Sequence, residues 1–272
     1  MPSTRTSRTT PLNRSGQDNS RVRRNRMTLS ALLMVAAVAA LQVTPVAAEE
    51  LGVDLELVLA ADGSGSIDAV EMALQRDGYA SAITSPEILD AIAQGFDRRI
   101  AVAYVEWGGA GSQHVIVPWT VIDGPESAGA FADALRGEPR RAVGHNSISN
   151  AIAFGQELIE RNTINGHRRV IDVSADSGNF GGMPLPLARQ SALEADITIN
   201  GLAILCRDLA CSGRPRAMDL EAHFANEVIG GPGSFVVTVD GERSFRDAVR
   251  QKLLLEIAGR PQAERLAAAP GR

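Results

Sequence analysis

Apolar residues follow two alternating spacings along the chain from position 53 onward. Short apolar runs predict strands at residues 53–61, 99–107, 113–121, 168–174, 197–205 and 235–239. Apolar residues at helical spacing predict helices at residues 68–82, 86–93, 126–135, 149–159, 184–194, 219–226 and 245–257. Because strands and helices alternate, we expect an α/β fold with a doubly wound, mostly parallel central sheet and helices on both faces.

A glycine-rich link separates two of the predicted strands. Residues 99–107 and 113–121 are joined by residues 108–112, with the sequence Gly-Gly-Ala-Gly-Ser. A link of this length and composition predicts a hairpin. One edge strand of the sheet is therefore expected to run antiparallel.

Residues 1–48 differ from the rest of the chain in composition. An arginine-rich segment precedes an apolar run at residues 29–43, and the small residues Val46, Ala47 and Ala48 follow the run. This pattern predicts a signal peptide cleaved after Ala48, because the apolar run is short for a membrane span. An uncleaved anchor is the alternative. We expect a periplasmic or secreted protein.

The rest of the chain is expected to form a single domain at residues 49–258. A chain of 272 residues with 44% hydrophobic content can bury a full core. Residues 259–272, with prolines and several alanines, are expected to form a flexible tail. No membrane span is expected in the mature chain.

The charge of the mature chain excludes two classes of partner. The full chain has a formal net charge of −5, and residues 1–48 hold seven arginines and one acidic residue. The mature chain therefore keeps 20 basic and 31 acidic residues, a net charge of −11. Nucleic acids and anionic membrane surfaces attract basic proteins, so neither is expected as a partner.

The two cysteines, Cys206 and Cys211, lie close together in a segment that resembles a loop. An exported chain meets an oxidising compartment, so a local disulfide is expected, with two free thiols as the alternative. Closing so short a loop constrains little of the unfolded chain, so the bond would stiffen one surface loop.

The first predicted strand leads directly into three side chains that carry oxygen. Asp62, Ser64 and Ser66 follow residues 53–61 and are separated by single glycines. Alternate side chains of an extended or turn segment point the same way, so these three should converge. Their oxygens favour Mg²⁺, Mn²⁺ or Ca²⁺ over zinc. Alternatively they only cap the turn and the next helix, for which Ser66 is the expected N-cap.

A second acidic residue is expected to meet this group. Asp176 follows the strand predicted at residues 168–174. Ligand sites of open parallel sheets lie beyond the carboxyl ends of the strands. Asp62 and Asp176 both stand at such ends and should therefore converge.

On these residues the chain resembles the von Willebrand factor type A (vWA) family, whose metal-ion-dependent adhesion site (MIDAS) opens with Asp-x-Ser-x-Ser. The resemblance covers residues 53–257 and is closest to a bacterial, mostly secreted branch of unknown function. It also rests on residues 170–176, 199–205 and 227–237. It implies that the predicted α/β fold is a vWA fold, which is similar to a Rossmann fold.

The resemblance further implies a metal site and a way of binding. The residues in ligand positions are Asp62, Ser64, Ser66, Asp176 and either Asn146 or Ser147. The last position holds threonine in the family, and both alternatives offer a neutral oxygen. By resemblance the site would hold Mg²⁺, or else Mn²⁺ or Ca²⁺. Unfilled coordination on the ion would attract an acidic side chain of a protein ligand.

Enzyme functions find less support in the sequence. A phosphate-binding loop needs a lysine before its serine or threonine, whereas the only lysine of the chain is Lys252. A serine-hydrolase elbow needs glycine two residues on either side of the serine, and Ser64 has Asp62 and Ser66 there. No catalytic residues are expected. The alternatives to a metal-dependent binding module are a metal-free interaction scaffold and a metal-assisted hydrolase.

Other titratable residues receive core roles or none. Core ion pairs are expected between the acids Asp54, Asp172 and Asp240 and the arginines Arg98, Arg168 and Arg169. The histidines are scattered along the chain as His114, His145, His167 and His223. Only His145 lies beside the predicted metal site.

Overall fold

A computed structural model describes residues 51–205, 218–240 and 245–259. The main sheet has six strands in the order β4-β3-β2-β6-β7-β8, and β1 and β5 form a separate sheet of two strands. The strands are β1 (Leu51–Val53), β2 (Glu56–Asp62), β3 (Ile100–Trp107), β4 (Gln113–Ile122), β5 (Ile164–Gly166), β6 (Arg169–Ala175), β7 (Thr198–Ile204) and β8 (Val236–Val239). The helices are α1 (Ala69–Ile83), α2 (Pro86–Ala93), α3 (Pro125–Gly137), α4 (Ile148–Arg161), α5 (Leu185–Glu194), α6 (Leu220–His223), the π-helix η1 (Phe224–Val228) and α7 (Phe245–Ala258).

The main sheet has the predicted topology. β2 pairs in parallel with β3 and β6, and the pairs β6–β7 and β7–β8 are also parallel. β4 lies at the edge, where it pairs antiparallel with β3. The predicted doubly wound α/β fold with one antiparallel edge strand is confirmed.

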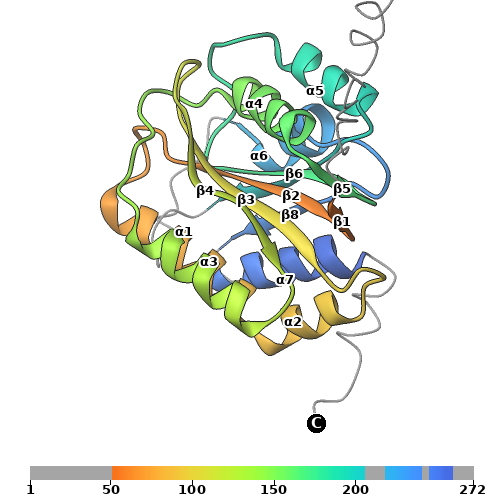
Figure 1. Ribbon diagram of the computed structural model, residues 1–272. Helices are drawn as coiled ribbons and strands as arrows, with labels where there is room; N and C mark the ends of the chain where they lie inside the picture. The colour runs from red at the N-terminus through yellow and green to blue at the C-terminus, as the bar shows by residue number, and fades with distance from the viewer. Residues whose placement is uncertain (1–50, 206–217, 241–244, 260–272) are drawn as a thin grey trace, which may run out of the picture. The chain divides into compact units, whose positions relative to one another are not determined.

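Helices cover both faces of the sheet (Figure 1). One face of the sheet, to which Leu57 and Leu59 of β2 point, is covered by α1, α2, α3 and α7. α4, α5 and α6 pack on the other face together with Val58 and Ala60. Successive side chains of a strand point to opposite faces, so both covers together bury every residue of β2.

The strand predicted at residues 53–61 is two strands in the structure. β1 ends at Val53, and β2 begins at Glu56 after a break at Asp54. β1 pairs in parallel with β5, a short strand that was not predicted. The break takes the first residues of the domain out of the main sheet.

The start of α1 also differs from the prediction, because Asp68 rather than Ser66 is its N-cap. The Asp68 carboxylate accepts the N–H groups of Val70 and Glu71, and the Glu71 carboxylate accepts the N–H of Asp68. This reciprocal capping satisfies the first turn of the helix. The Ser66 hydroxyl takes no part in it and faces the candidate site instead.

A buried ion cluster fastens α7 to the sheet. Lys252 Nζ lies 2.5 Å from Asp172 Oδ1 of β6 and 3.0 Å from Glu256 Oε1, and these side chains are at most 1% exposed. Glu256 also accepts the side-chain amide of Asn200 on β7 (2.8 Å). The partner of Asp172 is therefore the single lysine of the chain, and the expected pairing with an arginine is wrong.

Two of the arginines expected in core ion pairs bind main-chain carbonyls. Arg168 donates to the carbonyls of Glu256 and Ile257 at the end of α7. Arg169 donates to the carbonyl of Ala195 after α5 (2.7 Å). Each guanidinium group satisfies carbonyls that a helix leaves unpaired at its C-terminal end.

Three predictions concern residues outside the described ranges: the leader at residues 1–48, a disulfide between Cys206 and Cys211, and the tail beyond Gly259. Among the described helices, none combines the length and the apolar character needed to span a bilayer.

Candidate metal site

The carboxyl ends of β2 and β6 bring the two predicted acids together. Asp62 is the last residue of β2, and Asp176 directly follows β6, the parallel neighbour of β2. The loop between α3 and α4 carries Asn146 to the same place. These three residues are at most 5% exposed, so the surrounding loops enclose both acids.

Hydrogen bonds connect the side chains of this cluster. Asp62 Oδ1 accepts the N–H of Ser64 (2.8 Å), and Asp62 Oδ2 accepts the amide Nδ2 of Asn146 (2.6 Å). The hydroxyls of Ser64 and Ser66 lie 3.0 Å apart, and Ser66 Oγ donates to Asp176 Oδ1 (3.2 Å). The structure thus gathers all predicted ligand residues except Ser147.

Ser147 makes its hydrogen bonds elsewhere. Its hydroxyl donates to Asn150 Oδ1 (3.0 Å) and to the carbonyl of Gly181 (3.3 Å). Its N–H donates to the carbonyl of Gly108 (2.8 Å). Of the two alternatives for the position that holds threonine in the vWA family, Asn146 is the one that contacts Asp62.

Burial and repulsion determine the electrostatics of the cluster. Burial, and after it the neighbouring carboxylate of Asp176, raises the pKa of Asp62 to about 6 from its ordinary 3.8. The N–H groups of Ser64 and Asp176 lower this pKa only in part. Two enclosed carboxylates at neutral pH therefore need positive charge, and a divalent cation between them would supply it.

The donors of the cluster fit a hard divalent cation. Two carboxylates, two hydroxyls and one carboxamide can supply only oxygen ligands, which suits Mg²⁺, Mn²⁺ and Ca²⁺. Asn146 now turns its amide nitrogen toward Asp62. Ligation of a cation by Asn146 would require this amide to turn over and present Oδ1, because only the oxygen has lone pairs to offer.

Two side chains that the sequence did not indicate, Arg140 and Gln75, hold the main chain of the loop that carries Ser64 and Ser66. Arg140 donates to the carbonyls of Gly63 (2.9 Å), Ser64 (2.7 Å) and Ile67 (2.6 Å). Gln75 donates to the carbonyl of Asp62 (3.1 Å). These bonds hold the main chain of the loop while its side chains point to the cluster.

Gly63 lets this loop approach its neighbours closely. A Cβ atom at position 63 would lie 2.8 Å from Cβ of Ala142 and 3.2 Å from Cε of Met72. Any larger residue would push the loop away from α1 and from the loop that carries Asn146. The glycine thus contributes to the convergence of Asp62 with Asn146.

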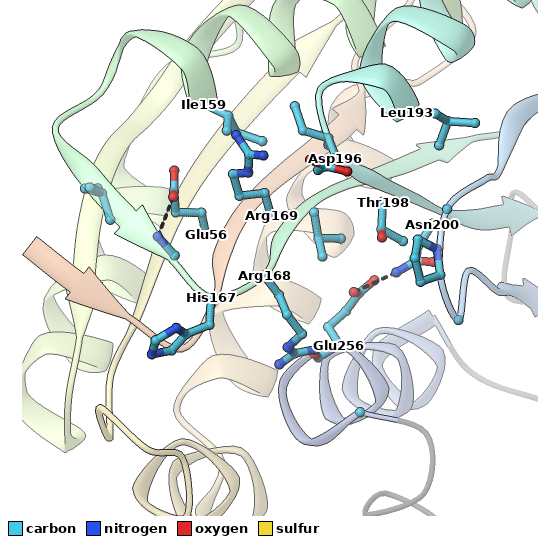
Figure 2. Close-up of a pocket in the computed structure, with 18 of the residues that line it drawn as sticks. Glu56, Ile159, His167, Arg168, Arg169, Leu193, Asp196, Thr198, Asn200 and Glu256 are labelled. Carbon is cyan, nitrogen blue, oxygen red and sulfur yellow. Dashed lines mark hydrogen bonds between the residues drawn. The ribbon is translucent and has the colours of Figure 1, made fainter.

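A pocket of about 980 Å³ lies at the opposite, amino end of the parallel strands (Figure 2). Its cationic residues include Arg168 and Arg169, whose guanidinium groups bind the carbonyls at the ends of α7 and α5. Glu56 accepts the amide of Asn162 there (2.8 Å). Because these charged groups serve the ends of the helices and a loop, we assign them a structural role.

Comparison with solved structures shows which fold this arrangement belongs to. Proximal thread matrix protein 1 from the mussel byssus, with a zinc-occupied MIDAS motif, aligns with a TM-score of 0.52 at 14% identity over 76% of this chain and 48% of its own. The open conformation of the pilus adhesin SpaC from Lactobacillus rhamnosus GG aligns with a TM-score of 0.52 at 15% identity over 79% of this chain and 30% of its own. The SpRpn10 VWA domain aligns with a TM-score of 0.48 at 12% identity over 74% of this chain and 95% of its own.

At these identities the two alignments with a TM-score of 0.52 show the fold alone, and the predicted vWA-like fold is confirmed. The chain spans half or less of the length of the byssus protein and the adhesin. A family model described as "Protein of unknown function (DUF1194)" matches residues 52–261. No curated protein sequence matches the chain.

Proposed function

The chain belongs to DUF1194, a family of proteins of unknown function, and from its own residues we propose that it is an exported module that binds a divalent cation and, through it, a protein ligand. The observation that carries the proposal is the convergence of two buried acids, two hydroxyls and one amide beyond the ends of β2 and β6. The proposed ligands are Asp62, Ser64, Ser66, Asn146 and Asp176.

Magnesium is the proposed ion, with Mn²⁺ and Ca²⁺ as substitutes. All the donors are oxygens, and Mg²⁺ and Ca²⁺ prefer oxygen ligands. Burial and the neighbouring Asp176 raise the pKa of Asp62, and any of these three ions beside it would favour the ionised carboxylate. The byssus protein holds zinc in its MIDAS motif, so a test for zinc at any other place in this chain has to use a variant that lacks Asp62.

The proposed protein ligand contributes an acidic side chain. Two carboxylates leave a divalent ion with coordination that neutral oxygens, water or an outside carboxylate can complete. One similar structure is a pilus adhesin, which supports an adhesive role rather than catalysis. The net charge of −11 in the mature chain argues against nucleic acid as the partner.

Catalysis is not part of the proposal. A metal-assisted hydrolase needs a general base in addition to the ligands of its ion. Glu106 lies behind Gly63, but its carboxylate is 0% exposed and pairs with Arg76 at 2.7 Å. Within the described residues we therefore assign no general base to the site.

Calorimetric titration of the purified mature protein with Mg²⁺, Mn²⁺ and Ca²⁺ measures whether the site binds a divalent ion. A capture experiment measures whether a protein ligand is retained through that ion. We expect wild-type protein to bind Mg²⁺ or Mn²⁺ and the Asp62→Ala variant to bind neither, because the variant lacks one of the two carboxylates of the cluster, on which three of its hydrogen bonds end. Immobilised wild-type protein should retain a partner from the exported fraction in Mg²⁺ buffer and release it in EDTA.

The matched control is Asp90→Ala, which removes an exposed carboxylate from α2 and should behave as wild type in both experiments. If wild-type protein gave no heat with any of the three ions, the proposal would be wrong. A partner that resists EDTA and is also retained by the Asp62→Ala variant would favour the metal-free scaffold.

A further inference from the structure

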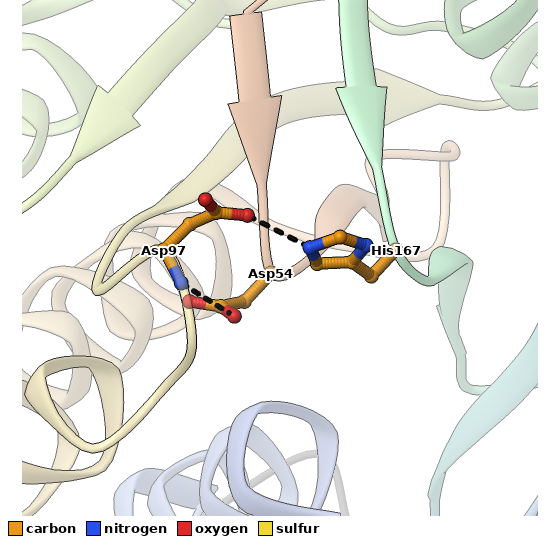
Figure 3. Close-up of side chains that lie close together, drawn as sticks. All are labelled: Asp54, Asp97 and His167. Atoms are coloured by element: carbon orange, nitrogen blue, oxygen red, sulfur yellow. Dashed lines mark hydrogen bonds and ion pairs between the residues drawn. The ribbon is translucent and has the colours of Figure 1, made fainter.

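A second group of side chains that can bind metal lies at the opposite end of β2 from Asp62. Asp54 stands between β1 and β2, Asp97 between α2 and β3, and His167 between β5 and β6 (Figure 3). One carboxylate oxygen of each acid and one ring nitrogen of His167 lie within 4.8 Å of one another. Three segments that are distant in the sequence thus bring these ligand atoms to one point.

Main-chain hydrogen bonds hold both acids in place. Asp54 Oδ1 accepts the N–H groups of Phe96 (2.7 Å) and Asp97 (3.1 Å), and the N–H of Asp54 donates to the carbonyl of Arg99 (2.9 Å). Gly95 makes this approach feasible, since a Cβ atom there would lie 2.1 Å from Asp54 Oδ2. The loop and the acid that organises it therefore form one rigid unit.

His167 is anchored by its main chain and retains freedom in its ring. Its N–H donates to the carbonyl of Val53 (2.9 Å). Its ring meets the edge of Phe96 at a centroid distance of 5.7 Å, and Nε2 lies 2.9 Å from Asp97 Oδ2. The His167 side chain is 58% exposed, so the imidazole can turn slightly without disturbing the core.

The cluster carries more negative than positive charge from its own members. Two carboxylates share one imidazole, and the Asp97 side chain is only 19% exposed. Arg168 lies close enough to be attracted by the charge of Asp54. The hydrogen bonds of the nearby guanidinium groups nevertheless go to carbonyls: Arg99 donates to Gly52 (2.8 Å), and Arg168 donates to the end of α7. A cation at this point would therefore relieve the repulsion between the acids.

We propose that Asp54, Asp97 and His167 form a second metal site, which binds Zn²⁺ or a similar transition-metal ion. A tetrahedral zinc ion with bonds of about 2.0–2.1 Å sets its ligand atoms about 3.3 Å apart. The three atoms lie within 4.8 Å of one another, so His167 and Asp97 would have to move toward Asp54, which its hydrogen bonds hold in place. The imidazole nitrogen favours zinc over Mg²⁺ and Ca²⁺, so this site and the all-oxygen cluster at Asp62 select different ions. Water completes the coordination.

The second site would join the first residues of the domain to its body. β1 and β5 form a sheet of their own beside the main one, and Asp54 and His167 follow those two strands. Asp97 belongs to the loop that leads into β3. A zinc ion would thus clamp the small sheet to the main sheet.

The test is a calorimetric titration with Zn²⁺ of purified mature protein that carries Asp62→Ala, so that zinc at the first site is not counted. We expect this variant to bind one zinc ion. Adding His167→Gln should weaken zinc binding by at least about tenfold, because loss of even an indirect partner of a ligand has an effect of this size. Adding His114→Gln instead should leave zinc binding unchanged, because His114 lies on β4 outside the cluster.

Thermal unfolding in EDTA provides the folding control. Each variant should unfold at nearly the temperature of Asp62→Ala alone, since both histidine side chains lie outside the core. Failure of the Asp62→Ala protein to bind zinc would overturn the proposal, as would unchanged binding after His167→Gln. Asp97→Asn, added to Asp62→Ala, removes the charge of a second proposed ligand and should also weaken zinc binding. Absence of Mg²⁺ binding to wild-type protein would refute only the first site.

Discussion

The Lys252→Met variant is expected to lose about 3–5 kcal/mol of the free energy of unfolding, because it leaves two buried carboxylates without their cation. Lys252 Nζ contacts Asp172 Oδ1 at 2.5 Å and Glu256 Oε1 at 3.0 Å. Burial already raises the pKa of Asp172 to about 6 despite the nearby lysine. Without Lys252, both acids would have to take up protons, and this uptake opposes folding at neutral pH.

Urea unfolding of the purified protein, followed by circular dichroism, measures this loss. Arg250→Met is the matched control on the same helix, because the ion pairs of Arg250 with Glu87 and Asp247, among the residues that the structure describes, are exposed. Exposed pairs of this kind contribute about 0–1 kcal/mol. Adding Asp172→Asn to Lys252→Met should recover part of the stability. Equal losses for Lys252→Met and Arg250→Met would show that the buried cluster is not the reason.

The Asp62→Asn variant is expected to make the protein more stable at pH 7.5 in EDTA while it abolishes any stabilisation by Mg²⁺. The folded state holds Asp62 with a pKa of about 6, above the ordinary value of 3.8, so ionisation at pH 7.5 opposes folding. This difference corresponds to at most about 3 kcal/mol, and we expect a gain of about 1–3 kcal/mol. Metal-binding residues often reduce stability in this way.

The pH dependence gives this prediction a definite sign. As the pH falls from 7.5 through 6 toward 4, the folded wild-type protein takes up a proton at Asp62 before the unfolded chain does, so this carboxyl group adds stability. Asp172 contributes in the same direction in both proteins. The advantage of Asp62→Asn should therefore shrink as the pH falls. An advantage that is constant between pH 7.5 and pH 5, measured by urea unfolding in EDTA, would contradict the argument.

The arrangement of the main sheet could be predicted because its signals are local. The central strands are rich in apolar residues, and the glycine-rich link after β3 indicates a hairpin. The convergence of Asp62 and Asp176 could be predicted because Asp62 ends β2, Asp176 directly follows β6, and the ends of neighbouring parallel strands meet in such a sheet. Pairing of three-residue strands such as β1 and β5 leaves no comparable pattern, since it depends on contacts between segments far apart in the chain.

Choices between neighbouring residues were less accessible to sequence reasoning. Ser66 and Asp68 are both good N-caps, and only the contacts of Glu71 decide for Asp68. Asn146 and Ser147 are adjacent, and which one meets Asp62 depends on the path of their loop. Gly144, with a φ of 93°, turns that loop in a way that most residues do not adopt.

Long-range partners of charged residues were not predictable. Arg140 reaches the carbonyls of Gly63 and Ser64 from a loop more than seventy positions away. Lys252 reaches Asp172 only because α7 crosses beneath β6 and β7. The sequence places Asp172 within a strand and offers arginines as buried partners, but it does not indicate which basic residue the fold brings to it. Such partners are set by the tertiary arrangement of the helices.

If the chain holds a ligand at the proposed metal site, the position of β2 has a mechanical consequence. This strand ends at Asp62, begins just after Asp54, and is hydrogen-bonded in parallel on both sides to β3 and β6. A force applied to the ligand at Asp62 and balanced near Asp54, at the other end of the strand, would act along the length of β2. Its hydrogen bonds to both neighbours would then be sheared together instead of opening one after another.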